Sequence, residues 1–177
     1  MNNNKKLIKL SFAGLFAAMI TVFIYLVHIP YGNTGYVHLG DTIIFLCASL
    51  LGQPYAILAS MIGGGLADLI SGFPIYIIPT VIIKGLIALT FSSKGSKILT
   101  KHNGIALVAS FLISVVGYAL AEFIFGIAFY GLPTAGALTT AATTILQNSI
   151  QAASNTLLYV VIALALDKLN FKRKFDF

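Results

Sequence analysis

The chain has 177 residues, of which 58% are hydrophobic and only 9% are charged, and its mean hydropathy is +0.95. A soluble domain carries roughly 25% charged residues, so this composition excludes a surface that faces water on every side. Length and composition together predict an integral membrane protein with a single membrane domain over residues 1–177.

The basic residues show where the chain meets the membrane surface. Because clusters of Lys and Arg mark the cytoplasmic side, their positions predict topology. Each cluster adjoins an apolar segment rather than lying on a basic face, so no nucleic-acid partner is expected. All of the 11 basic residues except Lys84 belong to three clusters: Lys5, Lys6 and Lys9; Lys94, Lys97 and Lys101; and Lys168, Lys172, Arg173 and Lys174.

Six apolar segments follow one another along the chain. The first has no convincing cleavage site after it, so we expect a membrane helix rather than a signal peptide. The second would be roughly 18 Å long as a helix, short of a membrane core of about 30 Å. The segments span about 7–28, 41–52, 55–71, 74–92, 104–130 and 138–166.

The second and third segments are counted separately because Pro54 suits the start of a new helix. A turn at 52–54 also gives an even number of crossings between the first two basic clusters, which places both on the same side. The sequence therefore predicts an all-α bundle of six transmembrane helices with both termini in the cytoplasm. Helix two is expected to be short or tilted.

The first outer loop, 29–40, is rich in aromatic and small residues. It contains Tyr31, Tyr36 and His38, with Gly32 and Gly35 between and beside the tyrosines. Interfacial Tyr often anchors a protein at the membrane surface. The alternative is an aromatic lid over a planar ligand, with the two glycines allowing the loop to bend.

Three charged residues fall at membrane depth, where a charge marks a pathway, a pair or a site. They are Asp68, Lys84 and Glu122. A structural ion pair between Asp68 and Lys84 is one interpretation, and contact of either residue with a substrate is the other. Asp41 follows Gly40 at the start of the second helix and is expected to cap it.

The sixth segment carries a polar stripe at intervals of three and four residues. Such spacing puts the side chains on one face of a helix. Some of these groups would bond neighbouring helices, but so many amides on one stripe favour the wall of a ligand cavity. Ser114, Tyr118 and Glu122 of the fifth segment are candidates for the same space. The stripe consists of Thr140, Thr143, Thr144, Gln147, Asn148, Gln151, Ser154 and Asn155.

Small residues recur four apart on the first helix, as Ala13 with Ala17 and as Gly14 with Ala18. Such faces let helices approach closely. Packing within the bundle explains the pattern, and docking on another membrane protein is the alternative.

Sequence motifs for catalysis are missing. The chain has no GxxxxGK[ST], HExxH, CxxC or GxSxG motif, so neither ATP hydrolysis by a P-loop nor another enzyme activity is indicated. No cofactor and no metal site are expected. The lone Cys47 lies inside an apolar run and is expected to pack in the core.

Two stretches, "YVHLGDTIIFLCASLLG" and "GGGLADLISGFPIYIIPTVIIKGL", resemble the S components of energy-coupling-factor (ECF) vitamin transporters. The resemblance covers nearly the whole chain. A short helix two opened by HLGD looks like the subgroup that takes up pyridoxine-like vitamins or the hydroxymethylpyrimidine half of thiamine. Ala13 and Ala17 match the contact motif that the family carries on helix one.

The resemblance implies a multi-pass protein of the bacterial plasma membrane that captures a vitamin from outside with high affinity. Helix one would dock, through Ala13 and Ala17, on a membrane-embedded T component that binds two cytoplasmic ATPases. The S component would topple in the membrane to deliver its ligand. The missing P-loop is then expected, because the partners supply the energy.

A small, flat, weakly charged ligand suits the polar residues of the chain. Aromatic rings would stack on it, Glu122 would accept its donors, and the amides would bond its hydroxymethyl groups. A self-contained proton-coupled carrier or channel and a purely structural subunit are the alternatives. The expected substrate-binding residues are Tyr31, Tyr36, His38, Lys84, Tyr118, Glu122, Gln147, Asn148 and Gln151.

Overall fold

The computed structural model describes residues 3–27, 29–31 and 35–174. The chain is 82% helical, which confirms the all-α class, and one two-stranded antiparallel hairpin interrupts the helices. The elements are α1 (Asn3–Leu26), β1 (Ile29–Tyr31), β2 (Gly35–Val37), α2 (Gly40–Leu51), α3 (Tyr55–Ile70), η1 (Pro74–Tyr76), α4 (Ile77–Thr90), α5 (Lys101–Ala128), α6 (Thr134–Lys168) and α7 (Phe171–Lys174).

Each predicted apolar segment contains one main helix. The turn at 52–54 separates α2 from α3 as predicted, whereas the fourth segment begins with a 3₁₀ turn, η1, before α4. Three helices, α1, α5 and α6, are long and apolar enough to cross a membrane, and the other apolar helices are shorter. The count of six crossings therefore stays a prediction.

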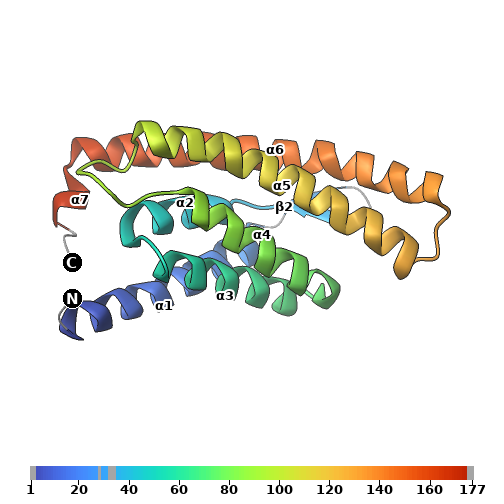
Figure 1. Ribbon diagram of the computed structural model, residues 1–177, viewed down its shortest axis with the longest axis horizontal. Helices are drawn as coiled ribbons and strands as arrows, with labels where there is room; N and C mark the ends of the chain where they lie inside the picture. The colour runs from blue at the N-terminus through green and yellow to red at the C-terminus, as the bar shows by residue number, and fades with distance from the viewer. Residues whose placement is uncertain (1–2, 28, 32–34, 175–177) are drawn as a thin grey trace.

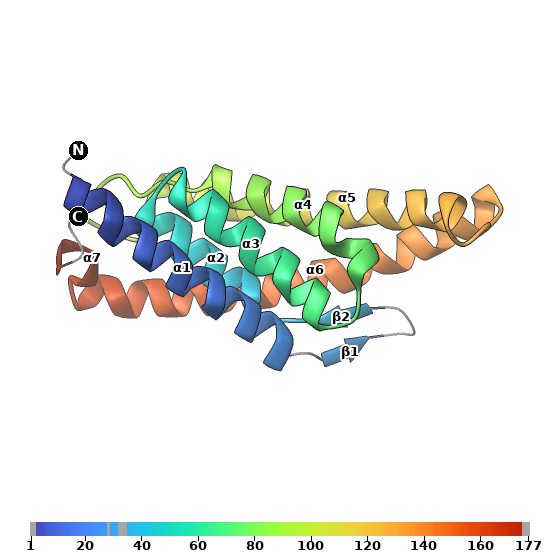
Figure 2. The same ribbon diagram turned by 90° about the horizontal axis from the view of Figure 1, so that it is seen from below.

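The helices form an elongated bundle in which α5 and α6 lie side by side along most of their length (Figure 1). Helix α1 packs on α3, and α3 packs on α4. The described parts of both termini lie at the same end of the bundle in two perpendicular views (Figures 1 and 2). The β1–β2 hairpin lies away from that end, beside α6 (Figure 2).

Helix α2 is the centre of the bundle, with α1, α3, α4 and α6 all in contact with it. All of its residues except Leu50 are buried. A helix that is mostly apolar around its circumference belongs in a core. Cys47 is fully buried here, in agreement with the predicted packing role.

Ala13 and Ala17 face into the bundle rather than outward. They are 5% and 7% exposed, and the Ala17 backbone lies against Gly63 of α3. The close α1–α3 contact thus favours packing within the bundle as the role of this pair, and docking of a partner there stays a prediction. The second small pair, Gly14 and Ala18, is exposed on the outer side of α1.

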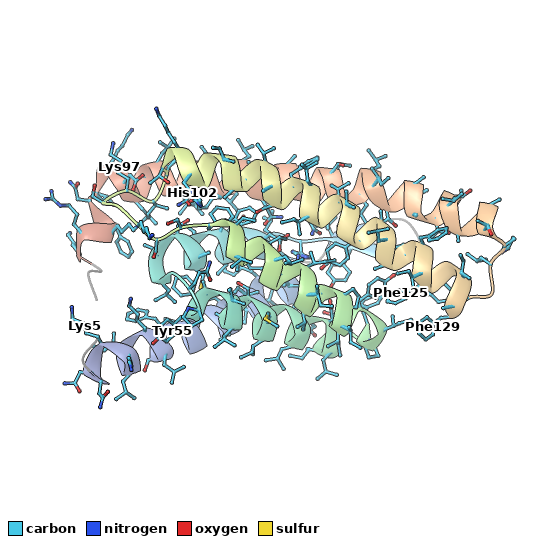
Figure 3. All side chains as sticks on the ribbon, in the orientation of Figure 1. Lys5, Tyr55, Lys97, His102, Phe125 and Phe129 are labelled. Atoms are coloured by element: carbon cyan, nitrogen blue, oxygen red, sulfur yellow. The ribbon has the colours of Figure 1, made fainter. Side chains whose placement is uncertain are left out.

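The end of the bundle that holds the termini is closed by a polar network. Lys5, Lys97 and His102 lie at this end, while Phe125 and Phe129 lie toward the other (Figure 3). Asp167 accepts the backbone N–H groups of Ile98 and Leu99 at 2.7 and 3.0 Å.

A buried lysine adds to this closure. Lys172 donates to the Lys97 carbonyl at 3.0 Å, and burial lowers the pKa of its ammonium group, with Asp167 acting in the opposite direction. The connection between α4 and α5 is thus held against α6 and α7.

Gly63 gives the first test of this packing. A Cβ placed on Gly63 lies 2.7 Å from the Ala17 carbonyl oxygen and 2.8 Å from the Ile20 Cβ. Gly63→Leu should therefore force α1 away from α3 and destabilise the protein by about 1–3 kcal/mol or more, as overpacking does. Thermal unfolding of the purified protein in detergent measures the loss.

The matched control is Gly14→Leu, since a Cβ at Gly14 meets nothing within 4 Å. This variant should unfold at or above the temperature of the wild type, because leucine also favours the helix more than glycine does. Equal unfolding temperatures for both variants would contradict the described α1–α3 contact.

Candidate functional site

A polar cavity lies inside the apolar bundle, next to the hairpin. The space not filled by atoms in and around it is about 590 Å³, including the open volume at its mouth. Helices α1, α3, α4, α5 and α6, the hairpin and η1 all contribute to its wall. The lining residues are Ile24, Tyr36, His38, Asp68, Phe73, Tyr76, Thr80, Lys84, Tyr118, Glu122, Thr144, Gln147, Asn148 and Gln151.

The structure brings most of the predicted site residues to this one cavity. Asp68 joins them in the wall, whereas the side chain of Tyr31 and all of Gly32 lie outside the described residues. Ser114 is buried but is not part of the lining. The predicted residues in the wall are Tyr36, His38, Lys84, Tyr118, Glu122, Gln147, Asn148 and Gln151.

Helix α6 supplies the amides because its polar stripe faces inward at the level of the cavity. Gln147, Asn148 and Gln151 line the wall. Towards the Thr134 end the stripe leaves the cavity: Thr143 is exposed, and its hydroxyl bonds the Thr140 carbonyl of the same helix at 2.7 Å. The periodicity thus predicts the direction of the face but not where the cavity ends along it.

Asn155 has a structural role instead of a place in the wall. Its Oδ1 accepts the Thr42 backbone N–H at 2.8 Å, and its Nδ2 donates to the His38 carbonyl at 2.8 Å. Both partners lie at the start of α2, where backbone groups have no partner within the helix. Asn155 therefore fixes the beginning of α2 on α6.

The hairpin is held over the cavity by two side chains. Gln147 donates to the Tyr36 carbonyl at 3.0 Å, and the Tyr36 hydroxyl donates to Oδ1 of Asp68 at 3.2 Å. The ring of Tyr36 lies 5.5 Å from that of Phe73. Burial raises the pKa of Tyr36, and Asp68 raises it further, so the phenol stays protonated and remains a donor.

A second phenol–carboxylate pair lies opposite, where Tyr76 donates to Glu122. Phe73, Tyr76 and Thr80 are cavity residues that sequence reasoning missed. The stretch from Phe73 to Tyr76 was read as a turn and the start of a membrane helix. Phe73 and Tyr76, two aromatic residues beside a predicted outer turn, are the sequence feature that could have indicated these cavity residues.

Lys84 forms its ion pair with Asp41, and not with Asp68 as predicted. Nζ of Lys84 lies 2.6 Å from Oδ1 of Asp41, and the side chains are 0% and 2% exposed. Asp41 is also not the N-cap of α2, because Leu39 occupies that position without a side-chain capping bond. The ion pair with Asp41 follows from the position of α2 inside the bundle, because its first turn reaches the depth of Lys84.

Two further contacts complete this buried pair. Nε2 of Gln151 lies 3.5 Å from Oδ2 of Asp41, and Nζ of Lys84 lies 5.3 Å from the centre of the Tyr118 ring. The Tyr118 hydroxyl is 3.1 Å from the Thr80 hydroxyl. The pair thus connects α2, α4, α5 and α6 at the floor of the cavity.

His38 lies between the hairpin and α2. Its Nδ1 accepts the Gly40 backbone N–H at 3.2 Å, and its ring lies 5.8 Å from that of Tyr36. Among the described residues, no group of three or more His, Cys, Asp or Glu side chains forms a candidate metal site.

Comparison with family models identifies one match. The model described as "ECF-type riboflavin transporter, S component" matches residues 4–168, which include every element that lines the cavity. The match confirms the family that the two sequence stretches indicated, but it does not support the pyridoxine or hydroxymethylpyrimidine subgroup. A comparison with curated proteins finds no match.

The buried pair gives a second test. Lys84→Met leaves Asp41 buried without its cation, which should cost about 3–5 kcal/mol of stability. The double variant Asp41→Asn with Lys84→Met removes both charges and should recover most of that loss. Thermal unfolding of the wild type, both single variants and the double variant forms a double-mutant cycle that measures the interaction free energy of Asp41 and Lys84. Additive losses in the double variant would show that the two residues do not interact.

Proposed function

We propose that this chain, which belongs to the ECF-type riboflavin transporter S component family, captures one vitamin outside a bacterial plasma membrane for ATP-driven uptake by partner subunits. The observation that carries the proposal is the cavity of amide, phenol and carboxylate groups enclosed in an apolar bundle. Polar groups at membrane depth are costly unless they serve a site or a pathway. The chain itself is the vitamin-binding membrane subunit and is not classed as an enzyme.

The proposed orientation places the termini in the cytoplasm and the hairpin outside. The basic clusters near both termini favour the cytoplasmic side for that end. The cavity wall includes Tyr36 of the hairpin and Phe73 and Tyr76 at the α3–α4 turn, and these segments belong to the outer end in a six-crossing arrangement. A vitamin would then enter past the hairpin.

The ligand that we propose is a small heteroaromatic vitamin, either a pyridoxine-type vitamer or hydroxymethylpyrimidine. Tyr36, Phe73 and Tyr118 offer aromatic faces for a flat ring. Gln147 and Asn148 of α6 offer amides for hydroxymethyl groups. Leaving such buried groups without a partner costs about 1–3 kcal/mol each, so a ligand that lacks the matching polar edges would be rejected.

Riboflavin is the second candidate, because the matching family model is described by that vitamin. Its larger ring system and polar tail would use the same aromatic and amide groups. Competition between riboflavin, pyridoxine and hydroxymethylpyrimidine for the purified protein separates the two candidates within the same proposed function.

The proposed partners are a membrane-embedded T component and two cytoplasmic ATPases. The chain contains no GxxxxGK[ST] motif, so the ATPases would supply the energy. Docking through α1 would use the exposed pair Gly14 and Ala18, because Ala13 and Ala17 are covered by α3. A proton-coupled carrier, with Asp68 or Glu122 as the proton site, would need none of these partners.

The vitamin site is tested by removing one group from each side of the cavity. Glu122→Ala and Asn148→Ala should each weaken vitamin binding at least tenfold, equivalent to about 1.4 kcal/mol, because each removes a buried polar partner. Titration calorimetry on purified protein measures the affinities. Thr143→Ala, an exposed change on the same helix as Asn148, is the control and should bind as the wild type does. Unchanged affinity in both cavity variants would remove these residues from the site.

Dependence on partners is tested in liposomes. The chain alone should bind the vitamin but not accumulate it under a pH gradient, and accumulation should require the T component, both ATPases and ATP. Gly14→Leu combined with Ala18→Leu should reduce uptake by the full complex without changing binding by the chain alone. Uptake by the chain alone under a pH gradient would establish the carrier instead.

A further inference from the structure

Carboxyl groups outnumber lysine and arginine side chains around the cavity. Three carboxyl groups, Asp41, Asp68 and Glu122, lie in or directly behind its wall, and Lys84 is the basic side chain among the described lining residues. Lys84 forms its ion pair with Asp41, with Nζ 2.6 Å from Oδ1. Asp68 and Glu122 are buried in the wall without a salt bridge in the described part of the chain.

The carboxyl group on which His38 acts electrostatically is that of Asp41, and Nδ1 of His38 accepts the Gly40 N–H at 3.2 Å. The phenols that bond the two carboxyl groups are neutral donors: Tyr36 bonds Asp68, and Tyr76 bonds Glu122.

Asp68 is the carboxyl group with an unused oxygen. Oδ1 accepts the Tyr36 hydroxyl at 3.2 Å, but Oδ2 is buried and has no hydrogen-bond partner. The Thr80 hydroxyl lies close enough to act on the Asp68 carboxyl group, and it is also 3.1 Å from the Tyr118 hydroxyl. An acceptor that is buried beside a cavity and left unpaired indicates a donor that arrives with a ligand.

Aromatic rings surround the same corner. The Phe73 backbone N–H bonds the Asp68 carbonyl at 2.9 Å, and the Phe73 and Tyr36 rings are 5.5 Å apart. The faces of such rings attract a cation, so the corner formed by Asp68, Tyr36 and Phe73 suits a positively charged group better than a neutral hydroxyl.

We propose that the vitamin carries a positive charge as an ammonium group beside its ring, and that Oδ2 of Asp68 receives it. This inference rests on the proposed function and narrows its ligand to cationic heteroaromatic molecules. The ligand then supplies the charge that the wall lacks, and Asp68 is the residue that selects for it.

Two matched ligand pairs test the inference on the full-length wild-type protein by calorimetry at neutral pH. One pair is pyridoxamine and pyridoxine, and the other is 4-amino-2-methylpyrimidine carrying an aminomethyl or a hydroxymethyl group at position 5. Within each pair the rings are the same, and only the aminomethyl member has a protonated amine. In the pair whose ring is bound, the aminomethyl member should bind at least tenfold more tightly.

The variant Asp68→Asn tests whether the preference for the aminomethyl ligand depends on Asp68. The substitution keeps the shape of the side chain but removes its charge, so the tenfold preference should fall to less than twofold. Thr143→Ala is the control and should keep the full preference. The wild-type comparison stands on its own if Asp68→Asn does not fold.

The outcomes separate the inference from the proposed function. Tight binding of a hydroxymethyl member or of riboflavin, without preference for the amine, overturns the inference and leaves the vitamin-binding function intact. A preference that survives in Asp68→Asn overturns the role of Asp68. No binding of any of these vitamins overturns the inference and argues against the proposed ligand class as well.

Discussion

The ion pair between Lys84 and Asp41 is the interaction on which the rest of the site depends. Both side chains are buried in the middle of an apolar bundle, where an unpaired charge is strongly unfavourable. The pair requires the first turn of α2 to lie against α4, and Gln151 and Asn155 tie the same turn to α6. The Lys84–Asp41 pair and its amide partners therefore fix the floor of the cavity, and the apolar helices pack around it.

Helix α6 separates its polar residues into two roles along one face. Asn155 satisfies backbone groups at the start of α2. Gln147 and Gln151 line the cavity, and Gln147 also donates to the Tyr36 carbonyl of the hairpin. The hairpin is joined to this arrangement through Tyr36, which bonds Asp68. A ligand that engaged Asp68 would thus share this carboxylate with Tyr36 of the hairpin.

The sequence predicts the helical class, the turn at 52–54 and the inward face of α6, because these follow from local periodicity and composition. It does not reveal that α2 lies inside the bundle, which is a property of the whole packing. One error follows from that gap: the predicted partner of Lys84 is Asp68, whereas the structure pairs it with Asp41. Tyr76 was missed because a 3₁₀ turn moves it from a predicted membrane helix to the cavity rim.

The central claim is that the cavity beneath the hairpin holds the vitamin. An experimental structure of the protein purified with its natural ligand tests it most directly. The account predicts ligand density between Asp68, Glu122 and the amides of α6, with Tyr36 and Phe73 against the ring. Density for the ligand outside this space, or a cavity filled by the protein's own side chains while the ligand is bound elsewhere, would contradict it.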